Sequence, residues 1–327
     1  MGEQKKVTHR NHFVAQGYLK NFATDDKRIY EIPFDKTKRA GIKHIRNTAK
    51  ETDLYTLENT AIFDRIDIAE EMLNVVEQAA HPLLRRLCEG KCRLNPQERG
   101  TLSHYFALQL TRGPEVQARY KHFLAFLDDQ KTTVSSLDDV NRIAKHYREG
   151  RFPYFDAATV WKNMNDENYT FSEVIMLDHL RNIFISAEDI YPYLLGRPWE
   201  FIYFRDYSLF TSDSPVSPFA VSREKAAQRF VVEDADGVIV PIGRKLAIRM
   251  GRSPKTPQGL SPLAAAMHKM FVERAISGEL DSRSLGTPED ADVFNKMTLD
   301  TAFRYIYRHP DDAHLNPEKL PNQSLLK

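Results

Sequence analysis

Several enzyme classes are marked by glycine-rich loops, and this chain has none of these motifs. Its 14 glycines form neither a Gly-x-Gly-x-x-Gly pattern nor a Gly-Lys-Ser/Thr sequence, which are signatures of loops that cradle phosphates. A Gly-x-Ser-x-Gly nucleophile elbow is absent as well. We therefore expect neither P-loop nucleotide hydrolysis nor ordinary esterase chemistry.

Cysteine is equally scarce. Cys88 and Cys92 are the 2 cysteines of the chain, and His81 lies about two to three helical turns before them. A structural zinc site normally takes four Cys or His ligands, and no other cysteine is present to complete one. We interpret the pair as ordinary reduced cysteines.

Neither sign of charge dominates the sequence, and apolar residues do not form long runs. Lys plus Arg number 46 against 45 for Asp plus Glu, which argues against wholesale electrostatic binding of nucleic acid but allows a local basic groove. The longest apolar runs, such as 236–242 and 262–267, are too short to span a bilayer, and no apolar stretch typical of a signal peptide opens the sequence. The composition predicts a cytoplasmic protein without a membrane partner.

The order of the expected elements indicates the fold class. A mixed segment is followed by a helical part, a strand-rich part, closing helices and a loose tail, at 1–60, 61–195, 196–252, 260–310 and 311–327. Grouped rather than alternating elements are typical of α+β proteins. We predict a single compact domain over 1–327, predominantly helical, with a small, mainly antiparallel sheet built from N-terminal strands and those of 199–250.

Helices are predicted from apolar spacings of three to four and from capping residues. The clearest has apolar residues from Ile68 to Leu87 and a glycine stop at Gly90. A second begins at Asn95-Pro96-Gln97-Glu98, which supplies an N-cap, a first-turn proline and a capping glutamate. The other expected helices cover 16–22, 114–129, 138–147, 171–188, 262–277 and 288–308.

Strands are predicted where polar and apolar residues alternate or where short apolar runs lie between turns. The expected strands are 28–32, 53–57, 199–204, 208–211, 230–233, 238–242 and 246–250. The turn Asp234-Ala235-Asp236-Gly237 predicts that the two strands around it form a hairpin.

The segment from His12 to Ala23 places His, Gln, Lys and Asn among Phe, Tyr and Leu, which a simple core helix would not need. Further motifs follow in order: the acidic stretch 70–77, Arg112-Gly113-Pro114, Trp199 with 210–216, Val240-Pro241-Ile242, and Asn295 with 302–305. In order and spacing these motifs resemble the domain-of-unknown-function 4238 family, a widespread microbial group. Lys20 stands where that family has Arg, and Ala15 where it has Pro. The resemblance implies no substrate.

His12 and Gln16 are the first candidates for a site. On an ideal helix they fall on one stripe, so both can face one cavity. In a functional interpretation His12 is a general base or metal ligand and Gln16 orients the substrate. In a structural one, His12 bonds a helix end and Gln16 satisfies buried backbone groups.

Glu70 and Glu77 lie two helical turns apart and therefore on one face. A carboxylate pair there can hold a divalent cation, and the alternative is a solvated acidic face. Gln109 and Arg112 share the face of a later helix. Arg112 can bind a phosphate or carboxylate of a substrate, or it can pair with one of the two glutamates as a structural bridge.

Asp213 follows a predicted strand, where the chain turns ahead of Pro215. Catalytic carboxylates are common at such positions, so we consider Asp213 as a catalytic or metal-binding group. Its carboxylate can equally accept hydrogen bonds from its own turn.

Arg99 and His104 have the spacing of a motif found in helical ribonucleases. Five helical steps rotate about 140°, so the two side chains are not expected to converge. A ribonuclease site of this kind is not predicted.

The candidate residues together predict a metal-dependent hydrolase that acts on phosphodiester or nucleotide substrates. Carboxylates would hold Mg²⁺ or Mn²⁺ while an arginine neutralises phosphate. Its partners would be nucleic acid or nucleotides, and by association with similar families it would suit an effector in bacterial conflict or phage defence. The alternative is a module that binds a protein or ligand without catalysis, whose polar residues form a structural network. We expect His12 and Gln16 to meet the acidic helix and Asp213.

Overall fold

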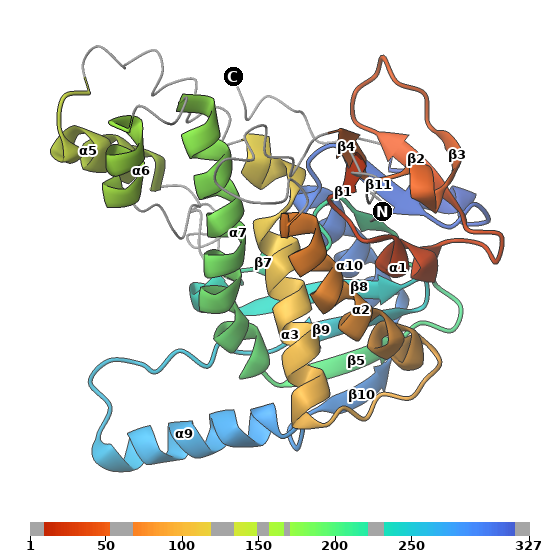
Figure 1. Cartoon of the computed structure of the whole chain (residues 1–327). Coiled ribbons are helices and arrows are strands. Elements are labelled where there is room, and N and C mark those ends of the chain that lie inside the picture. The colour runs from red at the N-terminus through yellow and green to blue at the C-terminus, as the bar shows by residue number, and fades with distance from the viewer. Residues whose placement is uncertain are drawn as a thin grey trace, which may run out of the picture.

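The computed structural model describes residues 10–52, 68–118, 134–148, 157–166, 171–221 and 232–317. Figure 1 shows a layer of long helices against a five-stranded sheet, with the N-terminal strands at one end of the molecule. Helices and strands are grouped along the chain, as predicted, and the α+β class is confirmed.

The first part of the chain folds into short strands around one helical turn. Its elements are, in order, β1 (Arg10–His12), α1 (Gln16–Leu19), η1 (Lys20–Phe22), β2 (Arg28–Pro33), β3 (Gly41–His44), η2 (Ile45–Asn47) and β4 (Lys50–Thr52). β1 pairs antiparallel with β4, and β2 pairs antiparallel with β3. Ala15 is extended, with φ −59° and ψ 135°, so α1 begins at Gln16. His12 therefore ends a strand while Gln16 opens a helix, and the helix predicted for 16–22 is confirmed.

Three long helices form the layer over one face of the sheet (Figure 1). They are α2 (Ile68–Cys88), α3 (Pro96–Thr111) and α7 (Phe171–Leu195). α2 buries Leu73 and Leu84 and ends ahead of Gly90, whose φ of 89° glycine adopts without a Cβ clash. α3 opens with the predicted capping box, in which Asn95 accepts from the N–H of Glu98 and the Glu98 carboxylate accepts from the N–H of Asn95.

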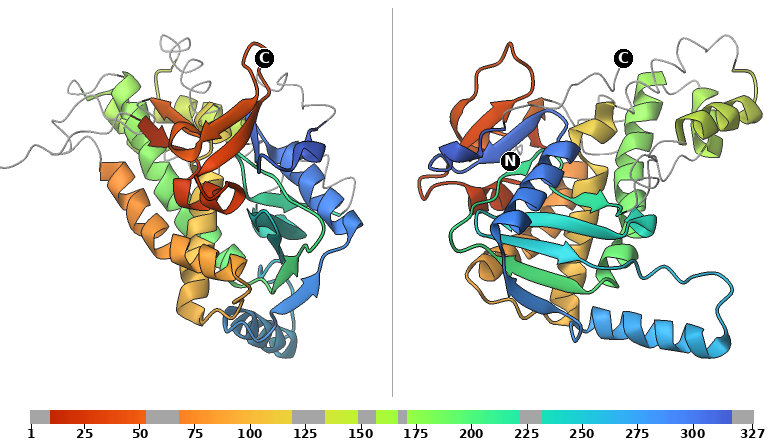
Figure 2. Two further views of the ribbon diagram at one scale, coloured as in Figure 1. Left: turned by 90° about the vertical axis from the view of Figure 1, so that its right-hand side faces the viewer. Right: turned by 180° about the vertical axis from the view of Figure 1, so that it is seen from behind.

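The five-stranded sheet is the centre of the fold. Its strands are β5 (Trp199–Tyr203), β7 (Ser217–Phe219), β8 (Gly237–Gly243), β9 (Leu246–Met250) and β10 (Ser282–Leu285), in the order β10-β5-β9-β8-β7. The β10–β5 pair is parallel and the other pairs are antiparallel. Every residue of β8 is buried, because the long helices cover one face and α10 (Pro288–Thr301) covers the other (Figure 2). The sheet is therefore mixed and larger than predicted.

A four-stranded sheet joins the two ends of the described chain. Its order is β3-β2-β11-β6, with β6 (Thr211–Ser212) and β11 (Tyr305–Arg308) from the second half. β11 lies between β2 and β6 and is antiparallel to both. The helix predicted for 288–308 is therefore wrong in its last part, because α10 ends at Thr301 and a strand follows. The predicted strands are divided among separate sheets rather than forming one.

One further local prediction is wrong, and two others lie wholly or mostly outside the described residues. Val232–Asp234 form the 3₁₀ turn η3, and β8 pairs with β7 and β9, so the hairpin predicted around 234–237 is wrong. The strand predicted at 53–57 and most of the helix predicted at 114–129 lie outside the described residues. The remaining elements are α5 (Leu137–Arg148), α6 (Ala157–Met164), α9 (Pro262–Ile276) and η4 (Ala313–Leu315).

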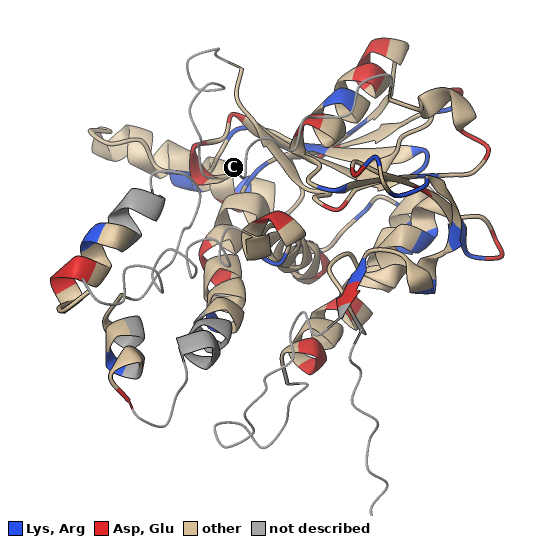
Figure 3. Cartoon of the chain, turned by 90° about the horizontal axis from the view of Figure 1, so that it is seen from above, with Lys and Arg blue, Asp and Glu red and all other residues tan. Residues whose placement is uncertain are grey.

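Charges of both signs are spread over the helices and strands, as Figure 3 shows from above. This agrees with the balance of 46 Lys plus Arg against 45 Asp plus Glu. Within the described ranges, no helix is both long enough and apolar enough to cross a membrane.

Candidate functional site

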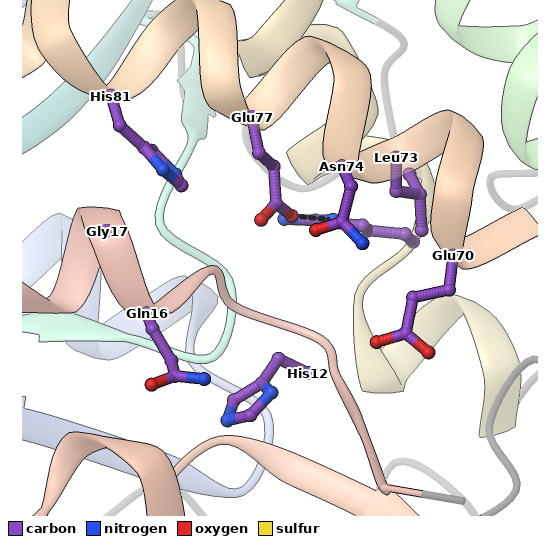
Figure 4. Close-up of a pocket in the computed structure, with 9 residues that line it drawn as sticks. His12, Gln16, Gly17, Glu70, Leu73, Asn74, Glu77 and His81 are labelled. Carbon is purple, nitrogen blue, oxygen red and sulfur yellow. Dashed lines mark hydrogen bonds and ion pairs between the residues drawn. The ribbon is translucent and has the colours of Figure 1, made fainter. Parts of the chain in front are cut away.

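A polar pocket of about 340 Å³ lies between the N-terminal segment and α2. His12, Gln16 and Gly17 form one wall, and one face of α2 forms the other (Figure 4). The lining from α2 and from the end of α3 consists of Glu70, Leu73, Asn74, Glu77, His81 and Arg112. Five of the six residues predicted for a site are thus brought around one pocket, and Asp213 is not among its lining residues.

His12 lines the pocket from the end of β1. Burial is the largest influence on its imidazole and lowers its pKa below the ordinary value, while Glu77 raises that pKa and Lys50 lowers it. Its Nε2 atom is buried and has no hydrogen-bond partner among the described residues. A neutral imidazole with an uncommitted ring nitrogen is suited to accept a proton.

His81 is a pocket residue that the sequence did not point to as part of a site. Its ring packs on the backbone of Gly17, where a Cβ would overlap the imidazole. The ring of Tyr105 meets it edge-on, with centroids 5.9 Å apart. Burial lowers the pKa of His81, and its Nε2 is also buried without a partner among the described residues. The available signal was a histidine four residues after Glu77, on the same helical face.

Glu77 and Arg112 form an ion pair where α2 meets the end of α3. Nη1 of Arg112 lies 2.5 Å from Oε1 of Glu77, and the arginine side chain is 1% exposed. Gln109, one turn before, accepts from Nε of the guanidinium at 3.1 Å when its amide oxygen faces the arginine. Of the two alternatives for Arg112, the structure shows the bridge to a glutamate of the acidic helix.

Glu70 lies toward the other end of the same α2 face. Its Oε2 accepts from Nδ2 of Asn11 at 2.5 Å, which ties the N-terminal segment to α2. Asn11 is buried, and its Oδ1 has no partner among the described residues. Gln16 and Asn74 are exposed at the rim. Glu70 and Glu77 are half-buried pocket residues rather than parts of a fully solvated acidic face.

Asp213 does not line the pocket. It is fully buried, and its two oxygens accept from the backbone N–H groups of Phe303 at 2.9 Å and Arg304 at 2.7 Å, just ahead of β11. Burial raises the pKa of Asp213 to about 7, and the two backbone donors oppose this increase. The carboxylate fastens β11 beside the turn after β6. The predicted meeting of Asp213 with His12 is therefore not found at this pocket.

The pocket carboxylates are the side chains best suited to a metal. Within the described residues, no three His, Cys, Asp or Glu side chains are grouped to ligate an ion. Mg²⁺ commonly uses one or two carboxylates together with waters and substrate phosphates, and Glu70 and Glu77 are the two carboxylates that line the pocket. Asp213, the predicted third ligand, is bonded to backbone. Cys88 and Cys92 are free thiols, as expected.

Arg99 and His104 make separate structural contacts. Nη1 of Arg99 donates to both oxygens of Asp281, at 2.9 and 2.7 Å, and the guanidinium lies 4.4 Å from the centre of the Trp199 ring. His104 instead lies 3.1 Å from Glu188. The two side chains do not share a partner, in agreement with their angular separation on the helix.

Fold and site together define an α+β protein whose N-terminal segment and acidic helix enclose a polar pocket. The chain belongs to the family described as protein of unknown function (DUF4238), whose model matches residues 10–312. No curated protein and no solved structure matches it. The resemblance inferred from spaced motifs is thus confirmed over nearly the whole chain, and the function has to be argued from the pocket.

Proposed function

We propose that the chain is a cytoplasmic hydrolase that acts on phosphodiester or nucleotide substrates with a divalent cation, Mg²⁺ or Mn²⁺. His12 carries this proposal, because its Nε2 is buried at a pocket with two carboxylates and has no hydrogen-bond partner among the described residues. Buried polar atoms of folded proteins are nearly always paired. A buried ring nitrogen left unpaired beside a pocket is therefore a candidate to bind or deprotonate a ligand.

His12 would take the proton of the attacking water. Its lowered pKa keeps the imidazole neutral near pH 7, so Nε2 can accept. Gln16, exposed at the rim, would orient the substrate through its amide. General-base catalysis of this kind contributes about 10²- to 10⁴-fold to the rate.

The charges around the pocket support the need for a cation. Glu70 and Glu77 supply two carboxylates against the single guanidinium of Arg112, and the lowered pKa values of both histidines keep them neutral near pH 7. This excess of negative charge would repel a phosphate. Glu70 and Glu77 would hold a divalent ion, which would offset this repulsion and act as a Lewis acid on the phosphate.

Arg112 would support the site through Glu77. Nη1 of Arg112 is bonded to the Glu77 carboxylate, and the arginine side chain is 1% exposed. A phosphate could therefore contact the guanidinium only by sharing it with Glu77. We therefore assign Arg112 as a positioning residue that orients Glu77 for the cation.

The proposal is tested by incubating the purified chain with DNA, RNA and nucleoside triphosphates, with Mg²⁺, with Mn²⁺ and with a chelator. We expect cleavage of at least one substrate class, loss of cleavage on chelation, and a rate about 10²- to 10⁴-fold lower for His12→Ala. His104→Ala is the matched control, since this histidine contacts Glu188 and does not line the pocket. Intact substrates with both metals, or full activity of His12→Ala, would overturn the proposal.

A second candidate is a module that binds a protein or ligand without catalysis. It is favoured by the paired groups around the pocket, Arg112 with Glu77 and Asp213 with backbone donors. Thermal melts of His12→Ala, Glu77→Gln and Asp213→Asn separate the two. A purely structural network predicts losses of several kcal/mol for all three, because each change leaves a buried partner unmet. A reaction site predicts near-wild-type melting of His12→Ala with lost activity.

In cells, such an activity would suit an effector in bacterial conflict or antiviral defence. This role is proposed by association with similar families, and counting phage plaques on bacteria that express the chain or its His12→Ala variant tests it. The proposal predicts fewer plaques with the unaltered chain alone, and equal counts would contradict it.

A further inference from the structure

The second histidine of the pocket carries an inference that rests on the proposed function. We propose that His81 is the general acid of the hydrolytic site, acting across the pocket from His12, and that Gly17 positions its ring.

The two histidines come from opposite walls. His12 ends β1, whereas His81 lies on α2 four residues after Glu77 (Figure 4). Both Nε2 atoms are buried, and neither has a hydrogen-bond partner among the described residues. Two such nitrogens at one pocket allow one ring to accept a proton while the other donates one.

Different charges surround the two rings. His12 faces Lys50 and Arg112 in addition to Glu77, whereas His81 faces Glu77 and Arg112. The additional cation disfavours the imidazolium form of His12, and a hydrogen bond with the backbone of Arg46 favours it. Glu77 lies one turn before His81 on the same helical face and favours its imidazolium. Both rings are mainly neutral near pH 7, so the roles follow from the geometry: His12 is the proposed base, and His81 is the other unpartnered ring of the pocket and takes the acid role in its protonated fraction.

Gly17 and Tyr105 hold the His81 ring from two sides. A Cβ at Gly17 would overlap the imidazole, and the Tyr105 ring contacts it edge-on at 5.9 Å between centroids. Burial raises the pKa of Tyr105 far above its ordinary value, so α3 adds no charge through this residue. The ring is thus fixed by packing, and its Nε2 remains without a protein partner.

The proton transfers balance within one turnover. Nε2 of His12 removes a proton from water as the water oxygen bonds to phosphorus. The bond between phosphorus and the leaving oxygen breaks, and His81, in the fraction of molecules in which its ring is protonated, gives its Nε2 proton to that oxygen. One water and one diester become a monoester and an alcohol, and exchange with solvent returns the proton from His12 to His81.

Two substrates with different leaving groups separate this role from a structural one. A 4-nitrophenolate leaves without being protonated, whereas an alkoxide requires a proton. The probes are thymidine 5′-(4-nitrophenyl phosphate) and the dinucleotide thymidylyl-thymidine, each with Mg²⁺. We expect His81→Gln to slow dinucleotide hydrolysis about 10²- to 10⁴-fold and to slow the nitrophenyl ester less than about 10-fold. His12→Gln should slow both, and His104→Gln neither.

Gly17→Ala provides a second variant, because it displaces the His81 ring without removing it and should reproduce the leaving-group selectivity. In the unaltered chain, the rate for the dinucleotide should fall as pH rises through the pKa of His81, which lies below its ordinary value of 6.5, and His81→Gln should abolish this decline. Equal losses on both substrates in His81→Gln would overturn the role of His81 and leave the proposed function intact. An unaltered chain that cleaves neither probe, nor any substrate of the broader screen, would overturn both.

Discussion

The pocket and the turn at Asp213 differ in whether their buried polar groups are hydrogen-bonded. In the turn, the two carboxylate oxygens of Asp213 accept hydrogen bonds from the backbone N–H groups of Phe303 and Arg304. In the pocket, the Nε2 atoms of His12 and His81 are buried without partners among the described residues. Folding alone explains the first arrangement, because each buried donor left unmet costs about 1–3 kcal/mol. It does not explain the second, and this contrast supports our proposal that chemistry takes place at the pocket.

The largest expected effect belongs to the turn. Asp213→Ala leaves two backbone donors without their acceptor, so we expect the free energy of unfolding to fall by about 3 kcal/mol in chemical denaturation. Ser214→Ala is the neighbouring control and should change it by less than about 0.5 kcal/mol. A loss below about 1 kcal/mol for Asp213→Ala would contradict the structural role that we assign to Asp213.

Gly17→Ala tests the packing of His81 against the N-terminal segment. The added Cβ overlaps the imidazole, and such overpacking costs about 1–3 kcal/mol of unfolding free energy. In a His81→Ala background the overlap is absent, so Gly17→Ala should cost less than about 0.5 kcal/mol. A double-mutant cycle measures the difference between the two costs, which is the coupling between Gly17 and His81. Gly41→Ala is the control, since a Cβ there meets nothing within 4 Å. Equal costs in both backgrounds would contradict the packing.

The two regions should also differ in the sign of their pH dependence. Asp213 has a pKa raised to about 7, so its contribution to stability is present below its ordinary pKa of 3.8 and is lost as pH rises toward 7. His12 and His81 have lowered pKa values, so their contribution is present above 6.5 and is lost as pH falls below it.

Unfolding free energies measured from pH 4 to 8 check these signs. In the unaltered chain, the contribution of Asp213 to the free energy of unfolding should decline as pH rises toward neutral, and Asp213→Asn should remove this decline. The contribution of the two histidines should decline as pH falls, and His12→Gln combined with His81→Gln should remove that decline. One proton accounts for at most about 1.4 kcal/mol per pH unit. Slopes of the same sign for both regions would contradict the assignment.

The smallest expected effect on stability is that of His12→Gln. Its Nε2 makes no bond within the described structure, so we expect the free energy of unfolding to change by less than about 1 kcal/mol. A thermal melt measures this, and a loss of 2 kcal/mol or more would make His12 part of the scaffold.

Local patterns predicted the elements that local interactions stabilise. The capping box at Asn95 and Glu98 and the glycine stop at Gly90 lie within a few residues of the helix ends they determine. The acidic helix was predicted to meet His12 and Gln16, and the pocket brings them together.

Features that depend on distant contacts were not predictable in this way. β11 pairs with β2, more than 250 positions earlier in the chain, and Asp213 bonds the backbone ahead of it, so nothing near Tyr305 shows that α10 should stop at Thr301. His81 is a site residue because folding brings its face of α2 against the N-terminal segment, where its ring contacts Gly17. The sequence shows each of these residues, but not the partner that gives it its role.

The central claim is that His12 and His81 are left unpartnered for a ligand. Histidine ring signals in ¹H–¹⁵N NMR spectra, recorded as thymidine 5′-monophosphate and Mg²⁺ are added to the whole chain, test it most directly. The account predicts that the Nε2 signals of His12 and His81 shift together at one ligand concentration while that of His104 stays in place. Unchanged signals from both pocket histidines at saturating nucleotide would contradict it.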